Sequence, residues 1–200
     1  MTHWLGGMGI VVLGLAVLPL LGHGAYGLYR AEFSGASAER LRPRIREIAQ
    51  SLALIYLALT ITLFVALWLA GMSAFEAICH AFSTLGTGGF STRNESIAAF
   101  NSPLIEYILA VFMLLAGISL IQHYRMWAER EPRRVWQDYE VRALLVLLFA
   151  STLLIAWQRY TEAPVSLEQA LRESLFQVAS ISSTTGFISA DYATWGPFAQ

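Results

Sequence analysis

The sequence predicts an all-α membrane protein made of repeated helix–pore loop–helix units with re-entrant pore helices. Three observations support this class: an apolar composition, four apolar segments of nearly spanning length, and a loop motif that recurs in the second half of the chain. Hydrophobic residues make up 56% of the sequence and charged residues only 14%, against about 25% charged residues in soluble proteins. The mean hydropathy is +0.53. Such a chain is expected to place much of its surface in lipid.

Four segments are long enough, or nearly so, to cross a hydrocarbon core that requires about 20 apolar residues. They are Trp4–Leu21, Ser51–Gly71, Pro103–Gln122 and Val141–Gln158. The first is rich in glycine, which suits close packing of helices in lipid. Arg142 and Arg159 flank the last segment and are expected to extend toward its two interfaces.

Two further apolar segments, Ala74–Leu85 and Leu167–Ser182, are too short to cross. The chain has no lysine, and ten of its arginines form two clusters. If both clusters are cytoplasmic, an even number of crossings separates them. The short segments are therefore expected to enter from the outer face and return to it. The clusters are Arg30, Arg40, Arg42, Arg44 and Arg46, and then Arg125, Arg130, Arg133, Arg134 and Arg142.

The recurring motif covers the end of each short segment and the residues that follow it. The stretch that begins at Ser83 returns in altered form at Ser180, an offset of 97 residues, and each copy has the form Thr-X-Gly-Phe. Small residues that present backbone carbonyls to an ion are typical of a pore loop, and glycine adopts backbone angles closed to other residues. The predicted ion-binding residues are Thr87, Gly88, Gly89, Thr184, Thr185 and Gly186. Phe90 and Phe187 are expected to brace the two loops.

Acidic residues lie around these loops but not in them, which argues against selection of divalent cations by a carboxylate ring. Glu95 and Asp191 follow the loops and are placed to draw cations toward the mouth. Glu76 and Glu173 are expected near the N-termini of the two short helices, where the helix dipole favours an anion.

Other interpretations of these residues remain open at this stage. Glycine and threonine also pack helices in lipid, and a secondary transporter with broken helices places such segments at mid-depth. Its repeats are commonly inverted, whereas these two loops are expected to enter from the same face. A membrane redox enzyme would use paired histidine ligands, but His80 and His123 are expected at opposite faces. The sequence therefore favours a pore without a catalytic site or a covalent cofactor.

Six stretches resemble the Trk/Ktr/HKT superfamily of potassium-translocating subunits, and most of all its bacterial TrkH family. They span nearly the whole chain in the family's order: Thr2-His3-Trp4-Leu5-Gly6-Gly7-Met8-Gly9-Ile10, Tyr29-Arg30-Ala31-Glu32, Pro43-Arg44-Ile45, Ser73-X-Phe75-Glu76-Ala77, Thr87-Gly88-Gly89-Phe90-Ser91-Thr92 and Thr184-Thr185-Gly186-Phe187. In that family four repeats surround one pore, and Gly89 and Gly186 match the single filter glycine of each repeat.

The resemblance implies potassium uptake across the bacterial inner membrane by a multi-pass, pore-forming subunit, with K⁺ as the transported ion. It implies a homodimer in lipid, a cytoplasmic nucleotide-binding regulator of the TrkA type and no nucleic acid. It leaves open whether transport is channel-like or a symport with H⁺ or Na⁺. One pore domain is expected, incomplete at both ends: the second helix of a repeat and a loop in 1–50, a complete repeat in 51–140, and a first helix with its pore loop in 141–200.

Overall fold

The computed structural model describes residues 2–7, 38–127, 132–192 and 195, and every regular element in that part of the chain is a helix. This confirms the all-α class. Residues 2–7 are helical. The remainder of the predicted first segment, Trp4–Leu21, lies outside the described residues, as do Arg30 and Arg130.

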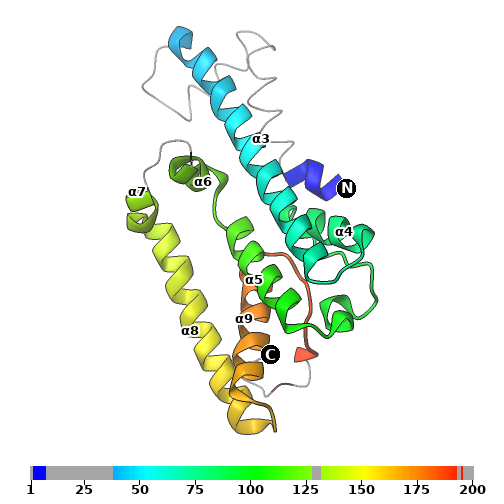
Figure 1. Cartoon of the computed structure of the whole chain (residues 1–200). Coiled ribbons are helices and arrows are strands. Elements are labelled where there is room, and N and C mark those ends of the chain that lie inside the picture. Colours follow the sequence, from blue (N-terminus) through cyan, green and yellow to red (C-terminus); the bar gives the residue numbers. More distant parts are fainter. Residues whose placement is uncertain (1, 8–37, 128–131, 193–194, 196–200) are drawn as a thin grey trace.

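Two long helices are apolar enough to cross a membrane by length and composition. Helix α3 covers Ala38–Leu69 and α8 covers Tyr139–Glu162. Their candidate spans are Ile48–Leu69, with mean hydropathy 2.5, and Tyr139–Glu162, with mean hydropathy 1.9. Figure 1 shows the two helices running in the same direction, from the end that carries α6 and α7 to the opposite end. The two helices are therefore parallel rather than antiparallel.

The two short segments form helices with the predicted bounds, α4 over Ala74–Leu85 and α9 over Leu167–Ser182. Each begins at a serine whose side chain accepts a hydrogen bond from the first helical turn. Ser73 and Glu76 form a reciprocal capping box, and Ser166 accepts from the backbone N–H of Gln169. These bonds satisfy backbone donors that the first turn of a helix leaves without partners.

The third predicted crossing is not one continuous helix, contrary to the expectation for Pro103–Gln122. Helix α5 ends at Gly117 and α6 covers Leu120–Trp127. Ile118 adopts an extended backbone with φ −82° and ψ 135°. Glycine is a poor helix former and a β-branched isoleucine accepts the extended conformation readily, so the interruption falls at this pair. The remaining elements are the 3₁₀ helix η1 over Ser96–Phe100 and α7 over Pro132–Gln137.

The hydrophobic core joins α3, α4 and α5 to α9. Leu63 of α3, Met113 of α5 and Phe176 of α9 are all fully buried in one cluster. In contrast, α8 exposes large apolar side chains such as Phe149 and Trp157. A soluble protein does not expose so much apolar surface on one helix, so this surface agrees with a helix that faces lipid.

Candidate functional site

The two predicted pore loops leave their helices through the same set of backbone hydrogen bonds. In each loop one N–H reaches back five residues and its neighbour reaches back three, which is the Schellman arrangement at a helix C-terminus. The bonds are Gly88 N to Ser83 O at 2.7 Å and Thr87 N to Thr84 O at 3.1 Å, then Thr185 N to Ser180 O at 2.9 Å and Thr184 N to Ile181 O at 3.0 Å. All four positions repeat with the 97-residue offset of the sequence motif.

Backbone handedness repeats in the same register. Thr87 and Thr184 have φ of 48° and 58°, and Gly89 and Gly186 have φ of 67° and 88°. Glycine takes these left-handed angles freely, but a β-branched threonine is an outlier there. Strain of this kind persists only where the surroundings enforce it, and it concentrates at functional sites.

The two loops lie directly against each other. A Cβ atom added to Gly89 would overlap the carbonyl oxygen of Thr185 and would come within 3.1 Å of the Gly186 carbonyl carbon. In the second loop, Thr184 and Gly186 are exposed while Thr185 and Phe187 are buried. The Thr185 hydroxyl is 2.7 Å from that of Ser183, so this side chain is turned into the protein, and the Thr185 carbonyl oxygen lies against Gly89.

The two phenylalanines behave differently. Phe187 is 1% exposed and its ring centroid lies 5.7 Å from that of His80 on α4. It therefore ties the second loop to the first pore helix, as predicted. Phe90 is 66% exposed and contacts the His3 ring at 5.4 Å. Phe90 therefore meets the helix over residues 2–7 through His3, but most of its surface stays exposed among the described residues.

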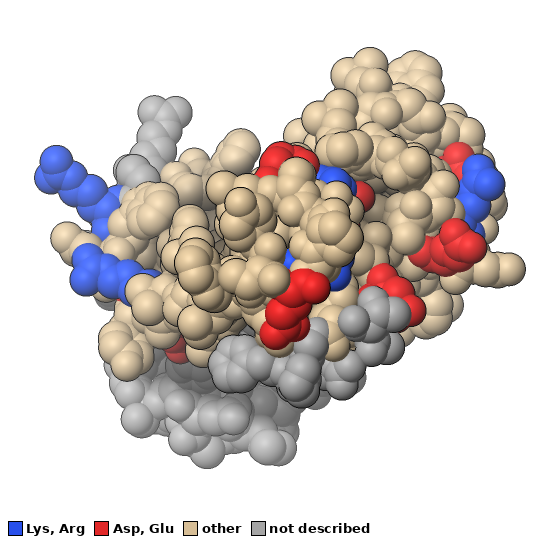
Figure 2. All heavy atoms as spheres, turned by 90° about the horizontal axis from the view of Figure 1, so that it is seen from below, with Lys and Arg blue, Asp and Glu red and all other residues tan. Residues whose placement is uncertain are grey.

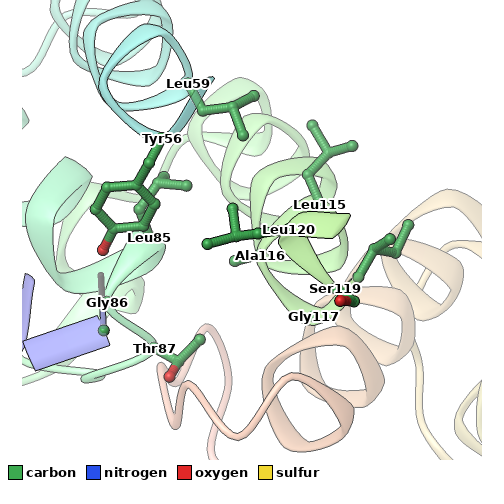
Figure 3. Close-up of a pocket in the computed structure, with 12 residues that line it drawn as sticks. Tyr56, Leu59, Leu85, Gly86, Thr87, Leu115, Ala116, Gly117, Ser119 and Leu120 are labelled. Carbon is green, nitrogen blue, oxygen red and sulfur yellow. The ribbon is translucent and has the colours of Figure 1, made fainter. Parts of the chain in front are cut away.

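Beside the first loop lies a cavity of about 240 Å³ between the loop and the break that separates α5 from α6. Figure 3 shows Gly86 and Thr87 on one side of it and Ala116, Gly117, Ser119 and Leu120 on the other. Tyr56 of α3 closes a third side. None of the described residues that line this cavity is charged.

Three helix C-termini converge on this region. Helix α4 ends at Leu85, which lines the cavity, and α5 ends at Gly117. A Cβ atom at Gly117 would lie 3.4 Å from the Cβ of Ser183, the C-cap residue directly after α9. Since a helix C-terminus carries a partial negative charge of roughly half an electron, the arrangement favours a cation without any acidic side chain.

The comparison with known families decides the identity of this fold. All 200 residues match the family model TrkH, described as "Cation transport protein". The chain belongs to the TrkH family. Members of this family are cation transporters and not enzymes.

Relatives of the TrkH family align over almost the whole chain. The Trk system potassium uptake protein TrkH of Escherichia coli K12 is 42% identical over 99% of this chain, and TrkG of the same organism is 34% identical over 96%. The crystal structure of the potassium transporter TrkH from Vibrio parahaemolyticus matches 98% of the chain with a TM-score of 0.79 at 38% identity. The chain spans about two fifths of the length of these relatives, 41% for the first and 40% for the structure.

The acidic residues near the pore helices have two different environments. Glu76 lies in the first turn of α4, as expected, where it accepts from Ser73 and pairs with Arg93 at 2.6 Å. The Ser73 hydrogen bond lowers the pKa of the Glu76 carboxyl below its ordinary 4.5, and Arg93 adds to this effect. Glu173 was expected near an N-terminus, but it lies well inside α9 because that helix begins earlier than the motif offset implies. It pairs there with Arg159 of α8 at 2.6 Å.

His80 and His123 are held by protein groups. His80 Nδ1 lies 2.7 Å from the Glu76 carbonyl and its Nε2 lies 2.9 Å from Ser91 Oγ. His123 Nδ1 lies 3.1 Å from the Ser119 carbonyl. Within the described ranges, no group of three or more His, Cys, Asp and Glu side chains could hold a metal ion. His80 therefore acts as a bridge between α4 and the end of the first loop.

Sequence reasoning missed one buried ion pair, between Glu106 of α5 and Arg172 of α9. A signal was present, because Glu106 is the one acid inside the apolar run 103–122. A lone ionisable group in such a run almost always faces a partner inside the protein. Its partner could not be identified without knowing that α9 packs against α5.

Proposed function

We propose that this chain is part of the pore-forming subunit of a potassium-uptake system, and that its two loops form part of the selectivity filter. The observation that carries the proposal is the repeated left-handed backbone at Thr87 and Gly89 and at Thr184 and Gly186, in two loops that lie in contact. The names of the similar proteins, which are potassium uptake proteins, support the choice of ion.

In the proposed mechanism, a dehydrating K⁺ exchanges water for backbone carbonyls of Thr87, Gly88, Gly89, Thr184, Thr185 and Gly186. Alternating backbone handedness lets successive carbonyls approach the same side of the loop. The Thr185 side chain is not among the proposed ligands, because its hydroxyl is buried beside Ser183. Partial charges of the α4 and α9 C-termini attract the cation, and the absence of carboxylates in both loops suits a monovalent ion better than a divalent one.

The proposed position in the membrane follows from chain direction and charge. Helices α3 and α8 run away from the end that holds α6 and α7 (Figure 1), and α4 and α9 begin where α3 and α8 end. With the arginine clusters in the cytoplasm, α4 and α9 enter the bacterial inner membrane from outside as re-entrant pore helices. Figure 2 views the end that would face outward, where acidic and basic side chains lie in a largely uncharged surface.

The remaining expectations belong to the same proposal. Residues 51–140 form a complete repeat, which residues 1–50 precede and residues 141–200 follow in one pore domain. The subunit is a homodimer in lipid and binds a cytoplasmic TrkA-like regulator. The parallel direction of α3 and α8 argues against a secondary transporter with inverted repeats.

Uptake of Rb⁺ or K⁺ by the full-length protein in a potassium-auxotrophic host tests this proposal. We expect growth at low potassium and uptake that a K⁺ excess competes away while Na⁺ competes weakly. Expression without any uptake, in a host that also supplies the regulator, contradicts the proposed function. Uptake of a solute other than an alkali cation contradicts the proposed filter.

A further inference from the structure

Helix α9 is held on one side by a buried network of charges that reaches across to α5. Arg172 Nη1 donates to Glu106 Oε2 at 2.5 Å, and the two side chains are only 11% and 6% exposed. Arg172 Nε also donates to Glu168 Oε1 at 3.1 Å. The same carboxylate accepts from the Tyr107 hydroxyl at 3.0 Å. Two residues of α5 are thus bonded to two residues of α9.

Among the described residues, α4 has no counterpart to this network. The motif offset places Phe75 at the position of Arg172, and Phe75 is 69% exposed. On α4 the nearby acid Glu76 instead pairs with Arg93, which belongs to the chain that leaves the first loop. The first loop is therefore braced by its own exit segment, and the second by a neighbouring helix.

Helix α5 also contacts α9 at its other end. Gly117, the last residue of α5, packs against Ser183, and Ser183 directly precedes Thr184 of the second loop. The charge network fixes the two helices near their outer ends, and the Gly117 contact lies at the start of the filter loop. A shift of α9 along α5 would therefore move Thr184 and Gly186 against Gly89.

We propose that Glu106 and Arg172 form a positioning pair that sets the register of the second filter loop relative to the first and thereby tunes selectivity between K⁺ and Na⁺. The effect on selectivity rests on the proposed function, whereas the effect on the position of α9 relative to α5 does not. A buried ion pair resists sliding because separating two desolvated charges is costly. Neither residue touches the ion in this scheme, since both lie on helices and outside the loops.

The test uses the full-length protein with Glu106→Gln, Arg172→Gln and the charge exchange Glu106→Arg/Arg172→Glu. Glu162→Gln is the matched control, because Glu162 is exposed and bonds only Gln158 on its own helix. Couplings of 0.5–2 kcal/mol through such positions correspond to about a 2- to 30-fold change in a binding ratio. We expect the K⁺/Na⁺ competition ratio in Rb⁺ uptake to fall by about that factor in both single variants, to recover at least in part in the exchange, and to stay unchanged in the control.

A second measurement separates this inference from the proposed function. Spin labels at exposed Leu104 of α5 and Leu167 of α9, in a cysteine-free background, report the distance between the two helices near the network. Glu106→Gln should shift or broaden this distance distribution, and the charge exchange should restore a narrow one. An unchanged distribution overturns the positioning role whether or not the protein transports K⁺. Normal uptake with unchanged selectivity in Glu106→Gln also overturns it, while leaving the proposed function intact.

If the single variants fail to reach the membrane, the charge exchange still decides. Recovery of insertion together with wild-type selectivity supports the pair as the element that sets the register. Insertion with a K⁺/Na⁺ competition ratio well below that of the wild type contradicts a pair that acts through mutual attraction. A lasting failure to insert, although the opposite charges are restored, contradicts it as well.

Discussion

Thr87 and Thr184 show that the conformation of the loops depends on more than glycine. Each occupies a left-handed backbone angle that glycine would accept without strain, at the residue after a helix C-cap. Strain of this type costs about 1–3 kcal/mol. A residue that is retained at such a cost is expected to supply something that glycine lacks, and in the proposed filter this is a hydroxyl and a stiffer backbone.

Substitution of the filter glycines by alanine should separate steric from conformational effects. Gly186→Ala places its Cβ in open space, so only the backbone strain at φ 88° acts. Gly89→Ala adds to the strain an overlap with the Thr185 carbonyl. We expect both changes to lower K⁺ over Na⁺ selectivity, by tenfold or more if about 1.4 kcal/mol of discrimination is lost, with Gly89→Ala the more severe. Competition of Na⁺ against Rb⁺ uptake measures the effect.

Gly71→Ala is the matched control, since Gly71 also has a positive φ, 105°, and open space around it, but lies outside both loops. It should reduce stability by a similar amount to Gly186→Ala and leave selectivity unchanged. Equal loss of selectivity in all three variants would mean that these glycines serve only for folding.

At the level of residues, the sequence predicted the loop glycines but not the contacts that support them. Gly89 and Gly186 stand out because the motif repeats and because left-handed turns favour glycine. The bond between His80 and Ser91 and the pair Glu106–Arg172 join residues whose proximity depends on helix packing. Phe90 and Phe187 occupy equivalent positions in the motif, yet Phe187 is buried beside α4 while Phe90 is exposed and contacts His3. Sequence equivalence alone could not reveal this difference.

The capping box at the start of α4 makes the stability of the folded protein depend on pH. Because the folded-state pKa of Glu76 lies below its ordinary value of 4.5, its contribution to stability is present above pH 4.5 and is lost as the pH falls through the folded pKa. We expect the unfolding temperature of the wild type to drop on acidification below pH 4.5. Glu76→Gln should lower this temperature at neutral pH and show a smaller drop in acid.

The measurement is a thermal unfolding series of the purified protein in detergent, with Glu140→Gln as the control. Glu140 is an exposed acid in the first turn of α8 that does not complete a capping box. Parallel pH curves for the wild type and Glu76→Gln would show that the capping carboxylate does not contribute.

The break between α5 and α6 predicts a segment that water can reach. Ser119 is exposed and lines the cavity below the first loop. In a cysteine-free, full-length background, Ser119→Cys should react with a membrane-impermeant cationic thiol reagent, and uptake should fall because the adduct fills the cavity. Uptake of the unreacted variant should stay near the wild-type rate.

Val111→Cys serves as the comparison, since Val111 is exposed on α5 and does not line this cavity. We expect its thiol to face lipid and to remain unreactive toward a charged reagent. Equal reactivity at both positions would argue that the exposure of Ser119 has no connection with an aqueous path.

The two short helices could be predicted from the sequence, but the break between α5 and α6 could not. Apolar runs bounded by serine on one side and by small polar residues on the other predicted α4 and α9 with their observed bounds. Gly117 gives no comparable signal, because a single glycine is common in membrane helices. The interruption depends on the combination of Gly117 with Ile118 and on the neighbouring Ser183, which only the tertiary structure supplies.

For the whole molecule, the two arginine clusters lead to a prediction about the regulator. The first turns of α3 carry Arg40, Arg42, Arg44 and Arg46. Of the second cluster, Arg125 lies in α6 and Arg133 and Arg134 lie in α7. Figure 1 shows these elements at the same end of the molecule. Replacing Arg42, Arg44, Arg133 and Arg134 by glutamine in the full-length protein should weaken co-purification of a TrkA-like subunit several-fold. Unchanged recovery of the regulator with correct insertion would leave the clusters as topology signals only.

The break between α5 and α6 affects how the membrane voltage is distributed across the protein. Helix α5 has 15 residues and is therefore about 22 Å long, less than a hydrocarbon core of about 30 Å. Irregular backbone at that depth must line water or be buried in protein, and the cavity adjoins it. With water in this cavity, the insulating layer is reduced largely to the two loops, and the membrane voltage falls mainly across them. Because a unit charge gains about 2.3 kcal/mol per 100 mV, an inside-negative potential would act on the ion while it sheds its water. Uptake measured at imposed potentials should then respond steeply to voltage.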